Sequence, residues 1–461
     1  MTTDLLYGLR ALLGTDRVLV GEDLAERYSH IWRMDEPLIA QAYLLPKSTA
    51  EVSSIMKLCY SHQQPVIVFG GLTNLVGSTE SSGQEIIISM EKLNQIEEID
   101  VMSRTITVQS GVLLEQIQNQ AKAEDMLFPL NFGAKGSAQI GGIISTNAGG
   151  LRVFKYGMTR QMVLGIEVVL ADGTIISSMK KIIKDNSAYD LKQLFIGSEG
   201  TLGIITKAIL KLVEAPRSRN SAFIGVSEYP KVVNLLKLLD SGLAGNLSGF
   251  ELIWNHTYRG FTNPNSGVKA PLPYDYPYYV LVETLGSNQE QDRAALTNLL
   301  EDALQKDIIE DATLAHSEAD IDWFFQLRED VHVLKSLCKH DQHFDISLPI
   351  PLIGEVINSI MEEAEQVECI EECFPFGHVA DGNIHFIFGK THQSPEIIKQ
   401  INDIVYGKLK AIGGSVSAEH GIGRHKKPYL SLCRSDEEIA LMKVLKNSMD
   451  PLTLLNPGNI F

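Results

Sequence analysis

The sequence predicts an α+β protein of two domains, the second built on an antiparallel sheet. At 461 residues the chain is too long for one hydrophobic core, and 44% hydrophobic with 21% charged residues is ordinary for a globular protein. The first half is rich in glycine and has short β-type runs between helical stretches, whereas the second half alternates longer strands and helices. The turn-rich passage EAPRSRN at 214–220 marks the boundary between them.

Apolar periodicity and β-branched content predict the individual elements. In the first half we expect a helix at 50–62 and strands at 64–69, 85–89, 105–109 and 165–170. In the second half we expect strands at 222–226 and 278–283 and helices at 229–241 and 288–305. A mainly helical segment at 428–446 precedes the closing MDPLTLLNPGNIF.

Composition argues against several classes of function. A net charge of −17 and a pI of about 5.2 argue against a nucleic-acid surface, which needs a basic face. No apolar run reaches the roughly 18 residues that a membrane-spanning helix needs. The opening MTTDLLYGLRALLGTDR carries acidic residues and is expected to be a helix rather than a signal peptide. Five scattered cysteines, an odd number, favour a reducing, cytoplasmic compartment.

The segment GHVADGNIH, from Gly377 to His385, predicts a hairpin that brings two imidazoles together. Asp381 and Gly382 are a strong signal for a two-residue type I′ turn, which needs positive φ at both central positions. In that register His378 pairs directly with His385, and directly opposed residues share a face with Cβ atoms about 5 Å apart. A single strand histidine is ordinarily a satisfied polar residue, but two imidazoles at that spacing can bind one metal ion.

A second glycine-rich segment, SAEHGIG at 417–423, supplies a carboxylate and a third imidazole. Glu419 would complete a three-ligand set with His378 and His385 and leave open coordination positions, as catalytic metal sites require. His420 would then lie beside the metal as a general base. Such ligands suit a divalent metal, with Zn²⁺ as the first choice and Mn²⁺ or Fe²⁺ as alternatives.

Three glycine-rich loops in the first half predict a groove for a long ligand with a pyrophosphate and a planar ring. The first is GGLTN at 70–74, after a predicted strand; the second runs from 133 to 150 and holds six glycines in eighteen residues; the third is GSEGTLG at 197–203. Such density implies main chain lying against a ligand. No GxGxxG follows a strand and opens a helix, and no P-loop is present, which disfavours a nicotinamide or P-loop fold.

Six ordered motifs resemble one family and span nearly the whole chain: GAKGSAQIGG, STNAGGLRVFKYG, GSEGTLGIIT, GHVADGNIH, GSVSAEHGIG and the terminal LLNPG. The sequence is similar to the FAD-dependent oxidoreductases of the vanillyl-alcohol-oxidase type. Within them it resembles the D-2-hydroxyacid dehydrogenases, which include D-2-hydroxyglutarate dehydrogenase, D-lactate dehydrogenase and the glycolate oxidase flavin subunit. The resemblance implies a two-subdomain FAD-binding domain at 1–215, a substrate or cap domain with the metal site at 216–445, and a C-terminal tail at 446–461 that returns to the FAD domain.

The resemblance also implies roles for individual residues. The metal would be held by His378, His385 and Glu419, in agreement with the hairpin argument, and His420 would be the base. Arg328, in QLRED, and Asn383 would contact the substrate; without the resemblance, Arg328 is more plainly a solvated helix charge. Noncovalently bound FAD would contact Gly70, Gly71, Thr73, Asn74, Gly136, Ser137, Gly141, Gly142, Thr146, Asn147, Gly203, Ile204 and Asn456.

The sequence departs from the family's pattern at two places. Phe69 and Leu72 stand where the flavin loop usually has an arginine and a small residue, so the phosphate cradle is expected to be shifted. In the 2-hydroxyglutarate branch a lysine precedes the aromatic-Asp-hydrophobic-Ser-Leu-Pro motif and a threonine follows the arginine by four positions. Those positions are His343 and His332 here, which makes them candidate substrate contacts that favour a differently shaped or less charged substrate tail.

The activity that the resemblance implies is oxidation of a small D-2-hydroxy acid to the 2-oxo acid. His420 would take the proton of a hydroxyl that a divalent metal acidifies, and the Cα hydride would pass to flavin N5. Two alternatives are an oxygen-using or metal-independent flavin alcohol oxidase of the same fold and a non-catalytic flavoprotein subunit. The electron acceptor is left open among an electron-transfer flavoprotein, a quinone and a dye-like acceptor. A homodimer is the family's expectation.

Overall fold

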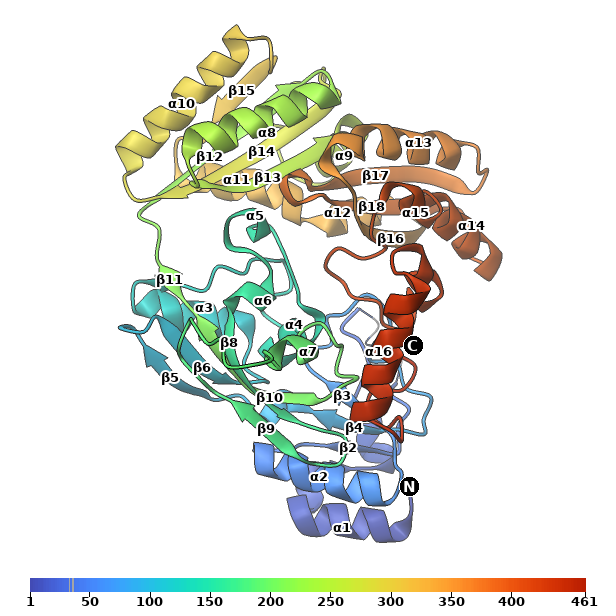
Figure 1. Cartoon of the computed structure of the whole chain (residues 1–461). Helices are drawn as coiled ribbons and strands as arrows, with labels where there is room; N and C mark the ends of the chain where they lie inside the picture. Colours follow the sequence, from blue (N-terminus) through green and yellow to red (C-terminus); the bar gives the residue numbers. More distant parts are fainter. Residues whose placement is uncertain (33, 35–36) are drawn as a thin grey trace. The chain divides into compact units, whose positions relative to one another are not determined.

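A computed structural model describes residues 1–32, 34 and 37–461 and divides the chain into two compact units (Figure 1). The first unit comprises Met1–Gly150, Gly157–Ala215 and Glu419–Phe461, and the second comprises Leu151–Tyr156 and Pro216–Ala418. The sequence places the end of the second domain at 445, whereas the chain rejoins the first unit from 419. It does so because the segment after 418 is hydrogen-bonded to the loop at 197–203 of the first unit.

The first unit contains a mixed sheet and an antiparallel sheet. The mixed sheet has the order β1-β2-β4-β3, and the antiparallel sheet has the order β5-β6-β10-β8-β9. The strands are β1 (Val18–Leu19), β2 (Ala42–Leu44), β3 (Val66–Phe69), β4 (Ile86–Ser89), β5 (Ile96–Asp100), β6 (Thr105–Gln109), β8 (Val163–Val169), β9 (Ile175–Ser178) and β10 (Ile204–Lys211), and the short β7 (Met126–Leu127) pairs with β11 (Val213–Glu214). The four strands predicted for this half correspond to β3, β4, β6 and β8.

Two long helices of the first unit begin at residues whose side chains cap them. Before α2 (Thr49–Ser61), the hydroxyl of Ser48 accepts the N–H of Glu51 at 3.2 Å. Before α16 (Asp436–Met449), Ser435 and Glu438 form a capping box. The other helices and 3-10 turns are α1 (Thr3–Leu13), α3 (Leu114–Ala123), α4 (Ile140–Thr146), α6 (Thr159–Met162), α7 (Lys192–Phe195), η1 (Thr15–Arg17), η2 (Gly21–Leu24), η3 (Met90–Lys92) and η6 (Lys427–Leu432).

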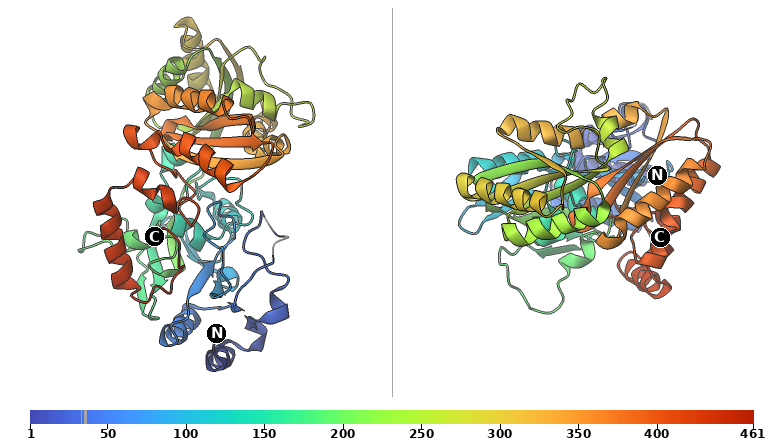
Figure 2. Two further views of the ribbon diagram at one scale, coloured as in Figure 1. Left: turned by 90° about the vertical axis from the view of Figure 1, so that its right-hand side faces the viewer. Right: turned by 90° about the horizontal axis from the view of Figure 1, so that it is seen from above.

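The core of the first unit lies between α1, α2 and the mixed sheet, and the C-terminal tail takes part in it. Leu455 from the tail is buried in this cluster with Leu5, Ile55 and Ile86. The buried amine of Lys446 donates to the carbonyl of Thr201 at 2.8 Å and to that of Leu455 at 3.0 Å. Figures 1 and 2 show α16 running along the side of this unit. The tail is therefore bonded into the first unit through both main chain and side chains.

Seven antiparallel strands form the sheet of the second unit, in the order β15-β12-β14-β13-β17-β18-β16. They are β12 (Ser218–Val226), β13 (Leu247–Trp254), β14 (Tyr278–Gly286), β15 (Asp311–Leu314), β16 (His340–Ser347), β17 (Ile370–His378) and β18 (Asn383–Lys390). β13 is buried along its whole length, as expected for a central strand whose two faces are both covered. With the mixed and antiparallel sheets of the first unit, this sheet confirms the predicted α+β class with an antiparallel second sheet.

Helices cover both faces of this sheet (Figure 1). On one face lie α8 (Tyr229–Leu243) and α10 (Gln289–Gln305), with α13 (Ile353–Glu365) against β17; on the other lie α9 (Asn255–Phe261), α11 (Glu318–Glu329) and α12 (Val331–Ser336). Under the second set, Phe223, Tyr258, Tyr279 and Phe324 pack ring against ring. The remaining elements are α5 (Val153–Tyr156), α14 (Pro395–Tyr406), α15 (Leu409–Ile412), η4 (Ile350–Leu352) and η5 (Val379–Asp381). Across the described part of the chain, no helix has the length and apolarity needed to cross a bilayer.

The short excursion Leu151–Tyr156 is anchored in the second unit by one carboxylate. Arg152 donates from Nε and Nη2 to the two oxygens of Glu283, each at 3.0 Å, and Arg219 adds a bond from Nε at 2.9 Å. Burial raises the pKa of the Glu283 carboxyl, but the charges and hydrogen bonds of Arg152 and then Arg219 outweigh it and hold that pKa below its usual value. Glu283 therefore stays ionised inside the sheet.

Glu283→Gln is expected to destabilise the second unit by about 3 kcal/mol at neutral pH, because it leaves two partly buried guanidinium groups without their carboxylate. The folded-state pKa of Glu283 is depressed. Its stabilisation is therefore complete above the unfolded-state pKa of about 4.3 and is lost as the pH falls through the lower folded-state pKa. The difference between wild type and variant in urea unfolding, followed by the fluorescence of Trp254 and Trp323, should therefore shrink as the pH falls.

The matched control for this prediction is Glu318→Gln. Glu318 contacts the same Arg219 at 3.5 Å, but its side chain is 73% exposed, so its loss should change the free energy of unfolding by less than about 1 kcal/mol. Equal penalties for the two variants, or a Glu283→Gln penalty that does not change with pH, would contradict the interpretation.

Candidate functional site

The predicted register of the GHVADGNIH hairpin is wrong. The sequence pairs His378 with His385, whereas the structure pairs Phe376 with His385 across β17 and β18. This shift by two residues leaves side chains on the same faces, because the face alternates with a period of two. His378 and His385 are therefore diagonal rather than directly opposed neighbours, and their ring centroids lie 5.3 Å apart with the rings nearly perpendicular.

The predicted two-residue type I′ turn is wrong as well. The connection is a 3-10 turn over Val379–Asp381 followed by Gly382, and of the two central residues only Gly382 has a positive φ, of 84°. Asp381 uses its side chain instead, since its Oδ1 accepts the N–H of Asn383 at 3.2 Å. Position 382 requires glycine, because a Cβ there would lie 2.5 Å from the carbonyl oxygen of Leu348.

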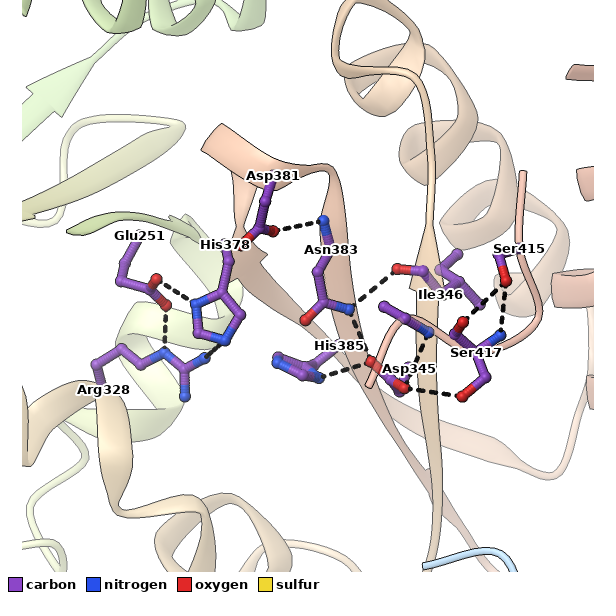
Figure 3. A network of polar contacts seen from close by, with 11 residues as sticks. Glu251, Arg328, Asp345, Ile346, His378, Asp381, Asn383, His385, Ser415 and Ser417 are labelled. Atoms are coloured by element: carbon purple, nitrogen blue, oxygen red, sulfur yellow. Dashed lines mark hydrogen bonds and ion pairs between the residues drawn. The ribbon is translucent and has the colours of Figure 1, made fainter. Parts of the chain in front are cut away.

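Glu251 orients both His378 and Arg328 (Figure 3). Its Oε1 bonds to Nδ1 of His378, and its Oε2 accepts Nε of Arg328 at 2.6 Å. Burial would raise the pKa of the Glu251 carboxyl, but the charges and hydrogen bonds of His378 and Arg328 outweigh it and lower that pKa to about 2. The carboxylate thus holds the Nδ1 edge of His378, so Nε2 is the nitrogen that presents a lone pair. Arg328 Nη2 lies 3.4 Å from that Nε2.

Asp345 lies beside His385 in a similar place, but at ion-pair distance rather than hydrogen-bond distance. It is fully buried in β16 directly opposite His385, and its Oδ1 lies 3.8 Å from Nδ1 of that ring. It also accepts the side-chain N–H of Asn383 at 2.7 Å and the backbone N–H of Ala418 at 3.2 Å. Each of the two imidazoles therefore has a buried carboxylate on its Nδ1 side, as a hydrogen bond for His378 and as a 3.8 Å ion-pair contact for His385.

Asn383 presents an acceptor to this site. Its Nδ2 donates to Asp345 and, at 3.1 Å, to the carbonyl of Ile346, and these two acceptors fix the orientation of the amide. Its Oδ1 is buried and has no hydrogen-bond partner. Figure 3 shows this oxygen directed to the side on which His378 and His385 lie. An unpartnered buried oxygen there matches a donor that a substrate would bring.

The two candidate tail-binding histidines lie in different elements. His343 belongs to β16, on the same face as Asp345, and its Nε2 lies 2.6 Å from Oδ2 of Asp341. The bond to His343, aided by its charge, holds the pKa of Asp341 well below its usual range. His332 is exposed on α12. The resemblance leads one to expect a lysine at this position. The histidine found there is paired with the carboxylate of Asp341.

Glu419 and His420 follow directly on the Asp345 cluster. Ala418 is the last residue of the second unit, and its N–H is bound to Asp345, so the chain that enters Glu419 starts from a fixed position. Within the first unit, the side chain of Glu419 packs against Gly149, where a Cβ would lie 2.6 Å from Oε1 of Glu419. Gly149, in the predicted second glycine loop, therefore leaves room for this carboxylate.

The predicted flavin loops come together inside the first unit, and two of their glycines are needed for chain-to-chain packing. A Cβ on Gly71 would lie 2.0 Å from the carbonyl oxygen of Ser137, so the loop at 70–74 packs directly on the loop at 133–142. A Cβ on Gly141 would lie 2.6 Å from Cβ of Ser110. These glycines permit close approach of two main chains rather than of main chain and ligand.

Other positions in the same loops do face open space and fit a bound cofactor. A Cβ on Gly142 would meet nothing within 4 Å, and one on Gly136 would meet only a carboxylate oxygen of Glu115 at 3.7 Å. Beside them, Oε1 of Gln139 and Oγ of Ser110 are buried without a hydrogen-bond partner. Open space lined by main chain and orphaned polar atoms is the environment that a nucleotide cofactor would fill.

Several predicted cofactor contacts serve the protein itself. Asn74 accepts the N–H of Ser78 at 3.1 Å, and Asn147 accepts the N–H of Arg160 at 2.9 Å from its left-handed position after α4. The hydroxyl of Thr146 bonds to the carbonyl of Gly142 at 3.1 Å. Thr73 and Ser137 stay at the loop surfaces, whereas Ile204 and the close contacts of Gly203 lie in the core.

Asn456 ties strand β3 to the third glycine loop. Its Oδ1 accepts the N–H of Val68 at 2.9 Å, and its Nδ2 donates to the carbonyl of Glu199 at 2.7 Å. Asn456 therefore holds these two segments together, and its contact with a cofactor stays a prediction.

The departures at Phe69 and Leu72 change the loop without opening it. Phe69 is fully buried and packs edge to face on Tyr43 at 6.0 Å between ring centroids. Leu72 adopts a φ of 57° and packs on the same hydrophobic cluster. Both side chains therefore point into protein, and the main chain of the loop still packs on Ser137.

Sequence reasoning missed Glu251 and Asp345. Glu251 stands in the apolar strand GFELIW, and Asp345 in FDISLP, each a lone carboxylate in a run that burial favours. An acidic residue among apolar neighbours inside a strand is the signal that could have found them, because such a group must be paired when buried. Their partners are distant in sequence, so the pairing itself could not be read from it.

Two family models match the chain. One, described as an FAD binding domain, matches residues 40–178, and one, described as the C-terminal domain of FAD linked oxidases, matches residues 215–460. Together they match residues in both units, outside 1–39 and 179–214.

Curated relatives match over nearly the whole chain. A mitochondrial D-2-hydroxyglutarate dehydrogenase of Danio rerio is 34% identical over 99% of this chain and 85% of its own length. A D-2-hydroxyglutarate–pyruvate transhydrogenase of Saccharomyces cerevisiae is 34% identical over 98% of this chain and 93% of its own. A mitochondrial protein of Schizosaccharomyces pombe assigned as a D-lactate dehydrogenase is 39% identical over 90% of this chain and 81% of its own.

Solved structures show the same fold at low identity. A p-cresol methylhydroxylase matches with a TM-score of 0.75 at 17% identity, over 99% of this chain and 96% of its own. An alkyldihydroxyacetonephosphate synthase matches with a TM-score of 0.74 at 16% identity, over 99% of this chain and 86% of its own.

Two glycine variants should separate packing from cofactor binding. Gly71→Ala is expected to destabilise the apoprotein by more than about 3 kcal/mol, since its Cβ would enter the van der Waals radius of a backbone oxygen. Gly142→Ala should leave the apoprotein as stable as wild type, because the position is open and helical, yet weaken FAD binding at least about tenfold. Apoprotein melting and FAD titration measure both; unchanged FAD affinity in Gly142→Ala would place the cofactor elsewhere.

Glu251→Gln should cost about 3–5 kcal/mol in the free energy of unfolding, because the buried guanidinium of Arg328 loses its counter-charge. The exposed pair of His256 and Glu372, at 2.6 Å, provides the control variant Glu372→Gln, which should cost less than about 1 kcal/mol. Chemical denaturation measures both. Equal penalties would mean that Glu251 does not organise the site.

Proposed function

Because this chain belongs to the FAD-linked oxidases, in the group that contains the D-2-hydroxyacid dehydrogenases, we propose that it oxidises a D-2-hydroxy acid to the 2-oxo acid with FAD and a divalent metal. The observation that carries the proposal is the arrangement of His378 and His385. Their rings lie 5.3 Å apart, and each has a buried carboxylate on its Nδ1 side. A pair of oriented imidazoles is the donor set that Zn²⁺, Mn²⁺ or Fe²⁺ would use.

The proposed metal ligands are His378, His385 and Glu419. Two imidazoles and one carboxylate leave coordination positions open for a substrate, as in catalytic metal sites. Glu419 joins the set by chain continuity, since Ala418 before it is bonded to the same Asp345 that faces His385. Zn²⁺ is the first choice among the metals because it is satisfied by this mixture of nitrogen and oxygen.

The substrate would be held by Arg328 and Asn383. Arg328 uses Nε and one edge of Nη2 internally, so the N–H groups of Nη1 remain to grip the carboxylate of a 2-hydroxy acid. The orphaned Oδ1 of Asn383 would accept the hydroxyl or a metal-bound water. His343 and His332 are the proposed contacts for the tail, and the pairing of His343 with Asp341 favours a tail that carries less negative charge than glutarate.

His420 would take the hydroxyl proton, and it needs a fixed direction to do so. Bound metal would lower the pKa of the substrate hydroxyl, and bound FAD would accept the hydride from Cα. The residues of this chain supply the rest. Arg328 and Asn383 orient the substrate, and the carboxylates of Glu251 and Asp345 hold the two imidazoles in place.

Cofactor binding is proposed for the glycine loops of the first unit. The open positions at Gly142 and Gly136, with the orphaned polar atoms of Gln139 and Ser110, support FAD there. Gly70, Thr73 and Asn456 border the same loops. The full set of proposed FAD contacts is the one predicted from the sequence. Within it, the role of Gly71, Gly141, Gly203, Asn74, Asn147 and Ile204 is to shape the loops.

The cellular setting is a separate proposal. A reducing, cytoplasmic compartment is the setting predicted from the sequence, while two of the relatives above carry a mitochondrial designation in their names. Electron-transfer flavoprotein, quinone and dye-like acceptors are each compatible with reduced FAD, and a homodimer is the proposed assembly.

The direct test is anaerobic bleaching of the flavin absorbance by D- and L-lactate and by D- and L-2-hydroxyglutarate. Bleaching by a D-acid alone is expected, lost after chelator treatment and restored by Zn²⁺ or Mn²⁺. Bleaching that survives chelation would favour a metal-independent oxidase, and rapid oxygen consumption an oxygen-using one. A colourless protein that cannot be reconstituted with FAD would identify a non-catalytic subunit.

His385→Ala and Glu419→Gln should each slow flavin reduction at least about 100-fold while FAD stays bound, because each removes a ligand and not a cofactor contact. Stopped-flow absorbance measures the rate, and the bound flavin is counted from its spectrum. His256→Ala is the control: this histidine also pairs with a carboxylate, but it is exposed, and its variant should reduce flavin at the wild-type rate. Loss of FAD from the two site variants would mean that these residues support the fold instead.

A further inference from the structure

Glu199 is a buried carboxylate of the first unit that the proposed chemistry does not use. Only 6% of the residue is exposed. Its Oε1 accepts the N–H of Ile422 at 2.7 Å, and its Oε2 accepts the N–H of Gly423 at 2.8 Å. These donors lie two and three residues after His420. Both oxygens of Glu199 therefore hold the main chain of the SAEHGIG segment.

Glycines let that main chain wrap around the carboxylate. Gly421 has a φ of 84° and Gly423 a φ of 51°. A Cβ on Gly421 would lie 2.9 Å from Oε1 of Glu199, and one on Gly423 would lie 2.2 Å from the carbonyl oxygen of Val76. Successive N–H groups that converge on an anion form an anion-binding nest. Here the acceptor is the protein's own Glu199 carboxyl group, whose pKa burial raises. Its contact accounts for Gly421, whereas Gly423 lies against the main chain of Val76.

The main chain of Glu199 bonds in the opposite direction, to the cofactor loops. Its N–H donates to the carbonyl of Ser145 at 2.8 Å, just before Thr146 and Asn147 at the end of α4. Its carbonyl accepts Nδ2 of Asn456 at 2.7 Å. One residue therefore connects the end of α4, the C-terminal tail and the segment that carries Glu419 and His420.

Backbone strain at Glu199 points to a function. Its φ is 51°, in the left-handed region that a non-glycine residue rarely adopts. Such a conformation costs about 1–3 kcal/mol and persists only where its surroundings determine it, often at functional sites. Here the four hydrogen bonds on its N–H, its carbonyl and its two carboxylate oxygens determine it.

We propose that Glu199 is a positioning residue that fixes the backbone bearing Glu419 and His420 and couples it to the cofactor loops. The role of His420 as a base rests on the proposed function. The holding of this segment by Glu199 does not depend on that function. Glu199 touches no reacting atom. It acts by holding the two N–H groups that follow the base, so that the direction of the imidazole is set before substrate arrives.

The first test does not depend on activity. In Glu199→Gln, one carboxylate oxygen becomes an NH₂ group that cannot accept, so hydrogen exchange at the amide of Ile422 or Gly423 should accelerate at least tenfold. Mass spectrometry of peptides spanning 417–426 in the FAD-loaded protein measures this. Glu85→Gln is the control. Glu85 is another buried carboxylate of this unit and accepts the N–H of Ser82 at 2.9 Å, and its loss should leave exchange at 417–426 unchanged. Unchanged exchange in Glu199→Gln overturns the proposal whatever the activity.

The second test is a double-mutant cycle with His420→Ala. Glu199→Gln alone should slow anaerobic flavin reduction by a D-2-hydroxy acid about 10- to 100-fold, with KM changed less than threefold and FAD content unchanged. In the His420→Ala background the same substitution should change the rate less than threefold, because there is no imidazole left to position. An equal loss in both backgrounds would show a general structural role and overturn the proposal.

A variant on the donor side provides an alternative test if Glu199→Gln folds poorly. Ile422→Pro removes one of the two N–H donors while leaving the carboxylate in place, and it should reproduce both the loss in rate and its dependence on His420. A wild-type rate in Ile422→Pro would count against the proposal. If no D-2-hydroxy acid bleaches the wild-type flavin, the proposed function fails, and the exchange experiment still decides whether Glu199 holds this segment.

Discussion

Two carboxylates buried in one sheet face, Glu251 and Asp345, determine how the candidate site is built. A buried carboxylate must be paired, and each of these pairs with the Nδ1 side of an imidazole. Glu251 holds Arg328 as well, and Asp345 also holds Asn383. The pairing of these two buried carboxylates therefore orients the two imidazoles, the guanidinium and the amide that the proposed chemistry uses.

The hairpin shows how much of such a site a sequence can predict. The proximity of His378 and His385 was predictable, because it depends on strand periodicity, and a register shift by two residues preserves it. The register itself was not, because Asp381 takes a negative φ and satisfies the turn with its side chain. The strands β3, β6 and β14 and the helices α2 and α10 followed from local pattern. Glu251 needed a partner more than one hundred residues away, which no local pattern contains.

The glycine loops show what a sequence pattern cannot assign, which is the role of each glycine. High glycine density correctly marked the segments that meet in the first unit, but it could not distinguish a glycine against a ligand from a glycine against another main chain. Gly71 and Gly141 belong to the second kind, whereas Gly142 faces open space. Gly421 belongs to a third kind, because a Cβ there would meet the Glu199 carboxyl group, whereas Gly423 lies against the main chain of Val76. Only tertiary contacts separate these roles.

X-ray absorption spectroscopy of the protein loaded with one equivalent of Zn²⁺ tests the central claim most directly, since it reports the atoms bound to the metal. Orientation of both imidazoles by buried carboxylates predicts two histidine nitrogens at about 2.0–2.1 Å with the outer-ring scattering of imidazole, and one oxygen ligand at about 2.0–2.2 Å from a carboxylate. Glu251→Gln should disorder one of those imidazoles. A spectrum without imidazole scattering, or one with sulfur ligands, would contradict the account.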